Sequence, residues 1–494
     1  MRVTDPDATE TKLVLPDRVS TDFLLHHRIC PSGMLPDGAL TVAVTEESLL
    51  QGLDDLSVAY DRRVMPRRVP AQELDVLLAR LTAADEGSVQ VEHAEREDEG
   101  FTSDVRDLAN QPPVVRYVNL LIREAYDARA SDIHLESTRA GLRARFRIDG
   151  VLLPGIDPPV HSDRAVVSRV KLLADLDIAE RRRPQDGRIR VRLKDRELDL
   201  RVSAVPTVFG ESVVLRLLDR GGAAIALDAL GLSADLLAVM QRLAQKPHGM
   251  ILVTGPTGSG KTTTLYAALG LRTAAAEKII AIEDPVEYSL EGVAQVPVHS
   301  QTGVTFASML RSILRQDPDV ILVGEMRDTE TAELAIQAAL TGHVVFSTLH
   351  TNDALGAIPR LLDLGVPPYL VTTTLEAVLA QRLVRRICEE CREPYVLEPA
   401  TVALLDEGGD LPGTLTRGRG CAACHGTGYR GRTGLFELLV LTDELRAAIV
   451  AEPSRRSLEQ VAREGGMRSL RADGWTKVAA GVTTVEEVLR VTQN

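Results

Sequence analysis

Long apolar runs, aromatic side chains and cysteines are all scarce in this sequence of 494 residues. No apolar stretch is long enough to cross a membrane, since even residues 223–240 contain Asp228 and Asp235. The amino-terminal end lacks the basic start and apolar core of a signal peptide, so we expect a cytoplasmic protein. Aromatic residues make up only 3% of the chain, which leaves aliphatic side chains to fill the cores.

Positive charge is also in short supply, because 57 Lys and Arg residues stand against 70 Asp and Glu residues. The formal net charge of −13 would repel nucleic acid, so we expect no direct nucleic-acid partner. Five cysteines are too few for a disulfide scaffold. Charged residues at 26% and hydrophobic residues at 44% are typical of a soluble globular protein, and the length predicts about three domains.

The pattern of the sequence changes along the chain. Residues 1–84 read as a small mixed domain with a hairpin after residues 36–38, and acidic side chains dominate residues 85–111, which predicts a solvated linker. Residues 112–222 begin with an amphipathic helix and continue with alternating strands, which predicts an α+β domain. Beyond residue 222, short apolar runs alternate with helical stretches, which predicts a parallel sheet covered on both faces.

Arginines line one face of the sheet predicted within residues 112–222. Arg143, Arg145 and Arg147 alternate with apolar residues along one strand, and two later strands repeat the layout. Three interpretations stay open from the residues alone: a nucleic-acid surface, a subunit contact that faces phosphate, and a solvated sheet face.

Residues 255–262 match the phosphate-loop pattern GxxxxGK[ST], directly after an apolar strand and before a helical stretch. Glycines let such a loop curl its N–H groups toward phosphate oxygens, while the lysine adds a point charge and the hydroxyl of Thr262 is offered to Mg²⁺. The sequence therefore predicts nucleoside triphosphate binding by Gly255, Pro256, Thr257, Gly258, Ser259, Gly260, Lys261, Thr262 and Thr263.

Two acidic residues follow strands of the same predicted sheet. Glu325 ends the strand at residues 319–324, and Glu283 follows the strand at residues 278–282. Carboxyl ends of parallel strands meet at one edge, so the two carboxylates predict a hydrolytic site beside Lys261. His343, at the start of a further apolar strand, is a candidate sensor of the γ-phosphate because neutral imidazole can donate to phosphate.

The cysteines suggest a metal site. Cys388, Cys391, Cys421 and Cys424 form two CxxC pairs separated by residues 392–420. Four thiolates at this spacing are typical of a structural Zn²⁺ site with no ligand position left for water, and a redox pair or buried thiols would be the alternative.

Taken in order, these motifs resemble the type II/IV secretion ATPases, in particular those of type II secretion systems. The resemblance covers residues 110–494 and depends on the phosphate loop, on the acidic segment 282–287, on residues 314–328 around Glu325 and on residues 341–353. It implies a RecA-like parallel-sheet ATPase core with α+β domains before it, a small zinc-binding insertion and a helical C-terminal segment.

The resemblance also implies domain borders and roles. The expected parts are a docking domain (1–84), a linker (85–111), a second N-terminal domain (112–222), the ATPase core (223–386), a zinc segment (387–434) and a helical end (435–494). By the same resemblance, Arg201 and Arg216 act on the nucleotide within a homo-hexamer, Glu283 is the candidate base, and Glu325 is the Mg²⁺-linked glutamate. ATP, Mg²⁺ and Zn²⁺ are the implied cofactors.

The implied activity is ATP hydrolysis that drives pseudopilus assembly for protein export. The docking domain would bind inner-membrane secretion platform proteins, which would place a cytoplasmic enzyme peripherally at the inner membrane. Two alternatives in the same superfamily are a type IV pilus assembly ATPase and a motor for DNA uptake. A third, a scaffold that binds nucleotide without hydrolysis, would require damage to Lys261, Glu283 or Glu325, and all three are intact.

Overall fold

The computed structural model describes most of the chain from the second N-terminal domain onward and parts of the first. The described residues are 24, 27–34, 39–45, 48, 52–60, 62–71, 73–75, 77–78, 90–91, 109–159, 162–193, 196–219, 225–272, 276–299, 302–397, 411–451 and 454–493. The predicted acidic linker at residues 85–111 lies mostly outside them.

The chain divides into two compact units. One comprises Met1–Asp127, His134–Ala144 and Gly155–Leu217, and the other comprises Ala128–Ile133, Arg145–Pro154 and Leu218–Asn494. The six parts expected from the sequence are finer than this division, and their borders stay a prediction.

The first part of the chain forms a three-stranded sheet. Strands β1 (Ile29–Met34) and β2 (Leu40–Val44) pair antiparallel, as the predicted hairpin requires. Strand β3 (Val64–Arg68) follows helix α2 (Gly52–Tyr60) and pairs parallel to β2. Leucines and other apolar residues from these elements, including Leu40 and Leu56, form a core of their own.

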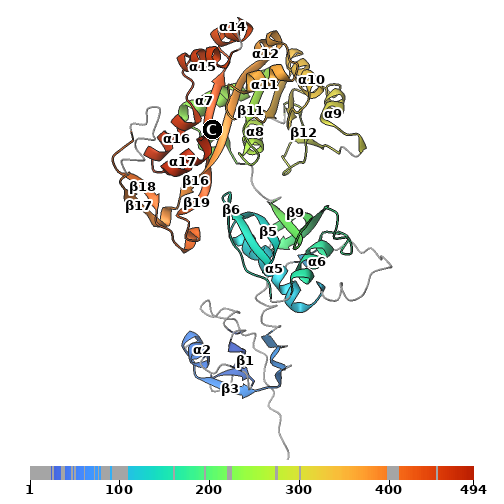
Figure 1. The fold of residues 1–494 in the computed structure, drawn as a ribbon, viewed down its shortest axis with the longest axis vertical. Helices are drawn as coiled ribbons and strands as arrows, with labels where there is room; N and C mark the ends of the chain where they lie inside the picture. The colour runs from blue at the N-terminus through green and yellow to red at the C-terminus, as the bar shows by residue number, and fades with distance from the viewer. Residues whose placement is uncertain are drawn as a thin grey trace, which may run out of the picture. The chain divides into compact units, whose positions relative to one another are not determined.

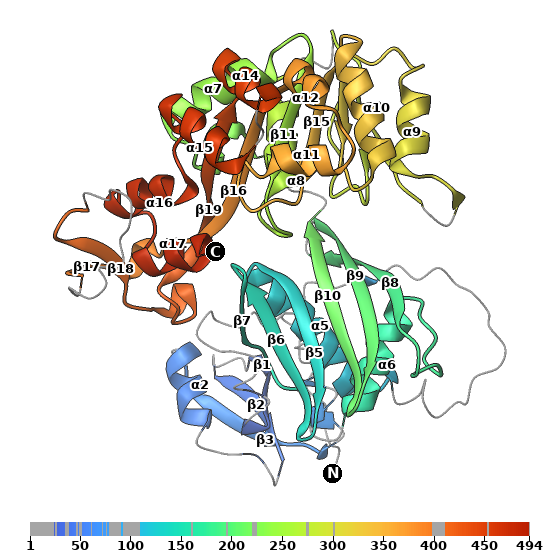
Figure 2. The ribbon, with the colours of Figure 1, turned by 45° about the horizontal axis from the view of Figure 1, so that its top comes forward.

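A seven-stranded sheet follows in the order β4-β8-β9-β10-β5-β6-β7. Helix α5 (Pro112–Asp127) buries the apolar stripe predicted from its spacing and packs against helix α6 (Asp163–Leu173). Figure 2 shows both helices on one face of this sheet. The strands are β4 (Gln90–Val91), β5 (Ala130–Thr138), β6 (Gly141–Ile148), β7 (Val151–Pro154), β8 (Gln185–Leu193), β9 (Arg196–Thr207) and β10 (Gly210–Asp219).

A second seven-stranded sheet, in the order β13-β12-β14-β15-β11-β16-β19, forms the core of the C-terminal part. All its neighbouring pairs are parallel except β16 with β19, which confirms the predicted parallel α/β core. The strands are β11 (Gly249–Thr254), β12 (Ile279–Glu283), β13 (Val293–Pro297), β14 (Val320–Val323), β15 (Val344–Leu349), β16 (Leu375–Ile387) and β19 (Tyr429–Val440).

Helices cover both faces of this sheet. Ile280 and Ile282 of β12 join a core with α9 (Phe306–Ile313), α10 (Thr329–Leu340), α11 (Ala357–Asp363) and α12 (Pro368–Thr374). Ile279 and Ala281, which point to the opposite face, join a core with α7 (Ala234–Ala244) and α8 (Lys261–Leu269), beside the short 3-10 helix η1 (Leu227–Leu230). Alternate residues of one strand thus serve two cores, which explains the uninterrupted apolar runs.

The long strands β16 and β19 connect the core to two further groups of elements (Figure 1). Between them lie the hairpin of β17 (Arg392–Tyr395) and β18 (Leu415–Gly418) and the short helices η3 (Glu389–Cys391) and η4 (Ala422–Cys424). Helices α14 (Asp443–Ala451), α15 (Arg455–Glu464), α16 (Leu470–Ala479) and α17 (Val485–Thr492) complete the chain. The predicted border between residues 434 and 435 falls inside β19, so the end of the zinc segment is also a strand of the core sheet.

Among the described residues, no helix combines the length and the apolar character that spanning a bilayer requires.

Candidate active site and metal centre

The phosphate loop connects the carboxyl end of β11 to the first turn of α8. Gly255, Gly258 and Gly260 adopt φ angles of 149°, 78° and 87°, a region that side chains with a Cβ rarely enter. A Cβ at Gly255 would lie 2.5 Å from the carbonyl oxygen of Gln381, and one at Gly260 would lie 2.9 Å from its Nε2. The glycines are therefore needed both for the curl of the loop and for its close packing on β16.

Lys261 is the first residue of α8, and its ammonium group lies over the loop. It donates hydrogen bonds to the carbonyl oxygens of Gly255, at 2.8 Å, and Pro256, at 3.2 Å. Burial lowers the pKa of Lys261, and the negative charge of Glu325 opposes that shift. The lysine and one of the two predicted carboxylates therefore lie within the range of each other's charge.

Glu325 follows the carboxyl end of β14, where the sequence placed it. Its carboxylate accepts from Arg327 at 2.7 Å and lies 3.3 Å from Nε2 of His350, and its side chain is 12% exposed. A hydrogen bond joins β14 and β15 at this edge, because Thr348 of β15 donates to the carbonyl oxygen of Gly324, just after β14, at 2.7 Å. Both oxygens of the Glu325 carboxylate thus face a nitrogen of a neighbouring side chain, and the carboxylate is mostly buried.

The structure brings His350, rather than His343, to this edge of the sheet. His343 precedes β15, and its Nδ1 lies 2.8 Å from the carbonyl oxygen of Ala338 and 3.1 Å from the hydroxyl of Thr341. His350 follows the last residue of β15. The two histidines flank six strand residues, so seven steps of about 3.3 Å separate them by roughly 23 Å. The role expected for His343 therefore fits the position of His350.

Glu283 is the last residue of β12 and lies at the same edge, but the residue is only 3% exposed. It continues the series of Ile279 and Ala281, so it points to the face covered by α8. There it accepts hydrogen bonds from the hydroxyl of Tyr266 and, at 2.9 Å, from Nε2 of Gln295. Burial raises the pKa of Glu283, and both hydrogen bonds counter the rise.

Some residues that support the loop were not identified from the sequence. Thr254 and Thr351 join the ends of β11 and the β15 loop through hydroxyls 2.7 Å apart. Gln381, 2% exposed, accepts a hydrogen bond at 2.6 Å from Thr264 of α8. Gln381 could have been found because it is the single amide inside the apolar run of β16, and a buried amide needs a hydrogen-bond partner in the fold.

The remaining residues of the loop suit a phosphate ligand. Pro256, Thr257 and Gly258 are exposed, and Thr262 and Thr263 lie in the first turn of α8. The Oγ atom of Ser259 is buried and has no hydrogen-bond partner within the described residues. A buried hydroxyl of this kind, beside left-handed glycines at the start of a helix, fits a loop that surrounds phosphate oxygens.

Arg201 and Arg216 belong to the other seven-stranded sheet. Arg201 of β9 stands opposite Arg188 of β8 in register and is partly buried, whereas Arg216 of β10 is exposed. The predicted alternation of arginines and apolar residues in this sheet is present, since Leu142, Ala144 and Phe146 are buried. The action of the two arginines on a nucleotide stays a prediction.

The four paired cysteines lie together, all with free thiols. Their Sγ atoms are all within 4.8 Å of one another. The Sγ atoms of Cys421 and Cys424 are 3.7 Å apart, and the Sγ atoms of the Cys388–Cys421 and Cys391–Cys424 pairs are each 3.9 Å apart. Zn–S bonds of about 2.3 Å in a tetrahedron separate two sulfurs by about 3.8 Å. The donor set therefore fits the predicted zinc.

The surroundings favour the thiolate at Cys424, whereas burial raises the pKa of Cys388 and of Cys391. Burial alone would raise the pKa of Cys424, but backbone N–H groups of Cys421, at 3.1 Å, and Gly428, at 3.2 Å, donate to its Sγ and bring the pKa to about 7.

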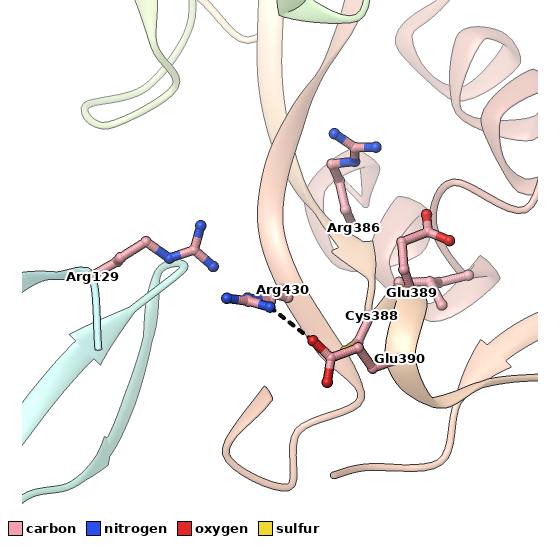
Figure 3. A pocket seen from close by; sticks show the side chains of 7 residues that line it. Arg129, Arg386, Cys388, Glu389, Glu390 and Arg430 are labelled. Carbon is pink, nitrogen blue, oxygen red and sulfur yellow. Dashed lines mark hydrogen bonds and ion pairs between the residues drawn. The ribbon is translucent and has the colours of Figure 1, made fainter. Parts of the chain in front are cut away.

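Figure 3 shows the surface beside this cluster, where Arg430 pairs with Glu390 at 3.2 Å and Arg386 lines a pocket next to Cys388.

The family model for "Type II/IV secretion system protein" matches residues 107–490. The chain belongs to this family. The match covers every strand of the two seven-stranded sheets except β4, together with the phosphate loop and the cysteine cluster, and it confirms the resemblance drawn from the motifs.

Relatives of this family member carry consistent names. Type II secretion system protein E of Xanthomonas campestris pv. campestris is 47% identical over 486 residues, which cover 96% of this chain and 85% of the relative. Type II secretion system ATPase E of Vibrio cholerae is 47% identical over 390 residues, which cover 79% of this chain and 77% of the relative.

Solved structures share the fold of the secretion family. The pilus retraction motor PilT with bound ADP is 28% identical with a TM-score of 0.52, and the match covers 76% of this chain and 96% of PilT. The Legionella pneumophila ATPase DotB is 20% identical with a TM-score of 0.58, and the match covers 80% of this chain and 97% of DotB. The likeness to DotB shows a common fold.

Proposed function

We propose that the chain is a cytoplasmic hexameric ATPase that couples ATP hydrolysis to pseudopilus assembly and protein export through a type II secretion system. The observation that carries the proposal is the site at the carboxyl ends of β11, β15 and β14, where the charge of Glu325 acts on Lys261 of the phosphate loop and His350 lies 3.3 Å from Glu325. The names of the relatives at 47% identity supply the transport system.

The residues of the site divide the work of phosphoryl transfer. The loop N–H groups and Lys261 hold the phosphates of ATP, and Thr262 offers a hydroxyl to Mg²⁺. Mg²⁺, when bound, would neutralise charge on the phosphate oxygens. The negative charge of Glu325 acts on the pKa of Lys261, so Glu325 is placed to orient the Mg²⁺ shell or the attacking water. His350, paired with Glu325, is placed to donate to the γ-phosphate.

The arginine-bearing sheet would complete the site in an assembly. Arg201 and Arg216 are proposed to act on the γ-phosphate when their domain closes over a nucleotide, in a homo-hexamer. Planar guanidinium groups suit the charge that develops on the transferred phosphoryl group. We also propose that residues 1–84 bind the inner-membrane platform, which would place the enzyme peripherally at that membrane.

The cysteine cluster is proposed as a structural zinc site. Its four ligands would be Cys388, Cys391, Cys421 and Cys424, and a closed thiolate set leaves no position for catalytic water. Its place between β16 and β19, two strands of the core sheet, would let the metal hold the ends of those strands.

A genetic test separates the three transport systems considered. The gene is removed from its host and restored as wild type, as Lys261→Ala, or as Lys246→Ala, a lysine that precedes β11 at the opposite edge of the sheet and pairs with Glu376. The proposal predicts that wild type and Lys246→Ala restore export of extracellular proteins and that Lys261→Ala does not. Loss of pili or of DNA uptake with normal export would instead assign the chain to one of those systems.

A further inference from the structure

Three polar side chains form a cluster under the phosphate-loop helix. Tyr266 comes from α8, Glu283 ends β12 and Gln295 lies in β13. The Tyr266 hydroxyl donates to Oε2 of Glu283, while Nε2 of Gln295 lies 2.9 Å from Oε1 of Glu283 and 3.2 Å from the Tyr266 hydroxyl. Both oxygens of the Glu283 carboxylate are therefore engaged by donors from two other elements.

The same cluster holds the loop that joins β12 to β13. The amide of Gln295 donates to the carbonyl oxygen of Tyr288 at 3.1 Å, and its oxygen accepts from the backbone N–H of Leu290 at 2.8 Å. The ring of Tyr288 meets the ring of Tyr266 edge to face, with centroids 4.7 Å apart. The loop that begins with Asp284 is thereby fixed to the helix that begins at Lys261.

We propose that Tyr266 and Gln295 are positioning residues that hold the Glu283 carboxylate in place for ATP hydrolysis and tie the loop after β12 to the phosphate-loop helix. This inference rests on the proposed function, because positioning has a consequence for turnover only if the site hydrolyses ATP. It also gives Glu283 a role distinct from that of Glu325, which acts near Lys261.

Electrostatics supports a held carboxylate. Burial and the negative charge of Glu287 both favour the protonated form of Glu283, and the two hydrogen bonds favour the ionised form. Tyr266 and Tyr288 are the other titratable groups that face it, and burial, the first cause in each case, raises the pKa of both, so both hydroxyls stay protonated near pH 7. Removing a donor would let the carboxylate rotate or take up a proton.

The test compares Tyr266→Phe with Tyr288→Phe. Both changes keep the ring and remove one hydroxyl, but only the Tyr266 hydroxyl bonds to Glu283. Tyr266→Phe should lower kcat by about tenfold with an ATP KM within about twofold of wild type, since a tenfold change corresponds to one hydrogen bond to a charged group. Tyr288→Phe should leave both constants near wild type, and Gln295→Leu should resemble Tyr266→Phe.

A double-mutant cycle with Glu283→Gln shows whether Tyr266 acts through Glu283. The expected result is that Tyr266→Phe has almost no further effect in the Glu283→Gln background. The inference is overturned if the effects multiply, if KM rises as much as kcat falls, or if Tyr288→Phe is equally slow. Absence of ATP hydrolysis in the wild-type chain would instead count against the proposed function, so the two failures are distinguishable.

Discussion

At the scale of single residues, the two histidines around β15 give the sharpest contrast. His350 pairs with Glu325, whereas His343 is bonded to the backbone at the far end of the strand. We predict that His350→Ala lowers kcat by about 10², as expected when a donor to developing negative charge is lost. His343→Ala is the matched control and should hydrolyse ATP like wild type. The measurement is the steady-state kinetics of both variants, and equal effects of His350→Ala and His343→Ala would contradict the assignment of this role to His350.

The sequence predicted which strands end in functional residues better than it predicted where the side chains point. Lys261 and Glu325 could be placed because the phosphate-loop pattern and the strand ends determine backbone position. Glu283 was correctly placed at the strand end. Its burial depends on Tyr266 and Gln295, which come from other elements and approach it only in the folded chain. His343 lies at the end of β15 away from Glu325, and its role stays a prediction, since both histidines flank the same apolar run and the sequence alone does not separate them.

At the scale of elements, the cysteine cluster should bind one Zn²⁺ per chain. Metal analysis of gently purified protein should give this ratio, and Cys421→Ser should release the metal while nucleotide binding persists, because the phosphate loop lies on other elements. Cys30→Ala, which changes a buried cysteine of β1, is the control and should keep its zinc. Protein purified without metal, or zinc retained by Cys421→Ser, would argue against the site.

Helix α17 offers a prediction on stability. Glu487 is buried and accepts from Arg385 at 2.7 Å and from Arg490 at 2.7 Å. Burial opposes its ionisation, but these hydrogen bonds overcome that cost and lower the pKa from 4.5 to about 2. A depressed pKa stabilises the fold above pH 4.5 and loses its contribution between pH 4.5 and 2. At neutral pH the contribution is on the order of 3 kcal/mol.

The measurement is hydrogen exchange in α17. Glu487→Gln should speed exchange of residues 485–492 at pH 7, and the difference from wild type should shrink as the pH falls through that window. The neighbouring Glu486 is exposed, so Glu486→Gln should exchange like wild type. Unchanged protection in Glu487→Gln would mean that apolar packing alone holds the helix.

The element pattern itself was largely predictable. The 3.6-residue period of α5 and the apolar runs of the core strands both appear in the fold. A helix that buries one face repeats its apolar residues at that period, whereas a strand that buries both faces is apolar throughout. The predicted end of the zinc segment falls inside β19, which returns antiparallel to β16 and continues into the core. No local signal marks the point where a strand leaves one group of elements and enters another.

At the scale of the whole molecule, turnover should depend on assembly. If Arg201 and Arg216 complete the site in a hexamer, ATPase activity per chain should rise with protein concentration together with oligomer size. Arg201→Ala or Arg216→Ala should assemble normally and lower kcat by up to about 10³, the lower range for arginine fingers. Arg143→Ala removes an exposed arginine of β6 and serves as the control. Arginine variants that assemble and hydrolyse like wild type would leave the basic sheet as a solvated face.

The central claim is that Lys261 and Glu325 belong to one ATP-hydrolysing site. The most direct measurement sets nucleotide affinity beside steady-state hydrolysis for wild type, Lys261→Ala and Glu325→Gln. The account predicts that Lys261→Ala loses tight binding, whereas Glu325→Gln keeps it and loses turnover by about 10² or more. Glu325→Gln protein that binds ATP and hydrolyses it at the wild-type rate would contradict the account.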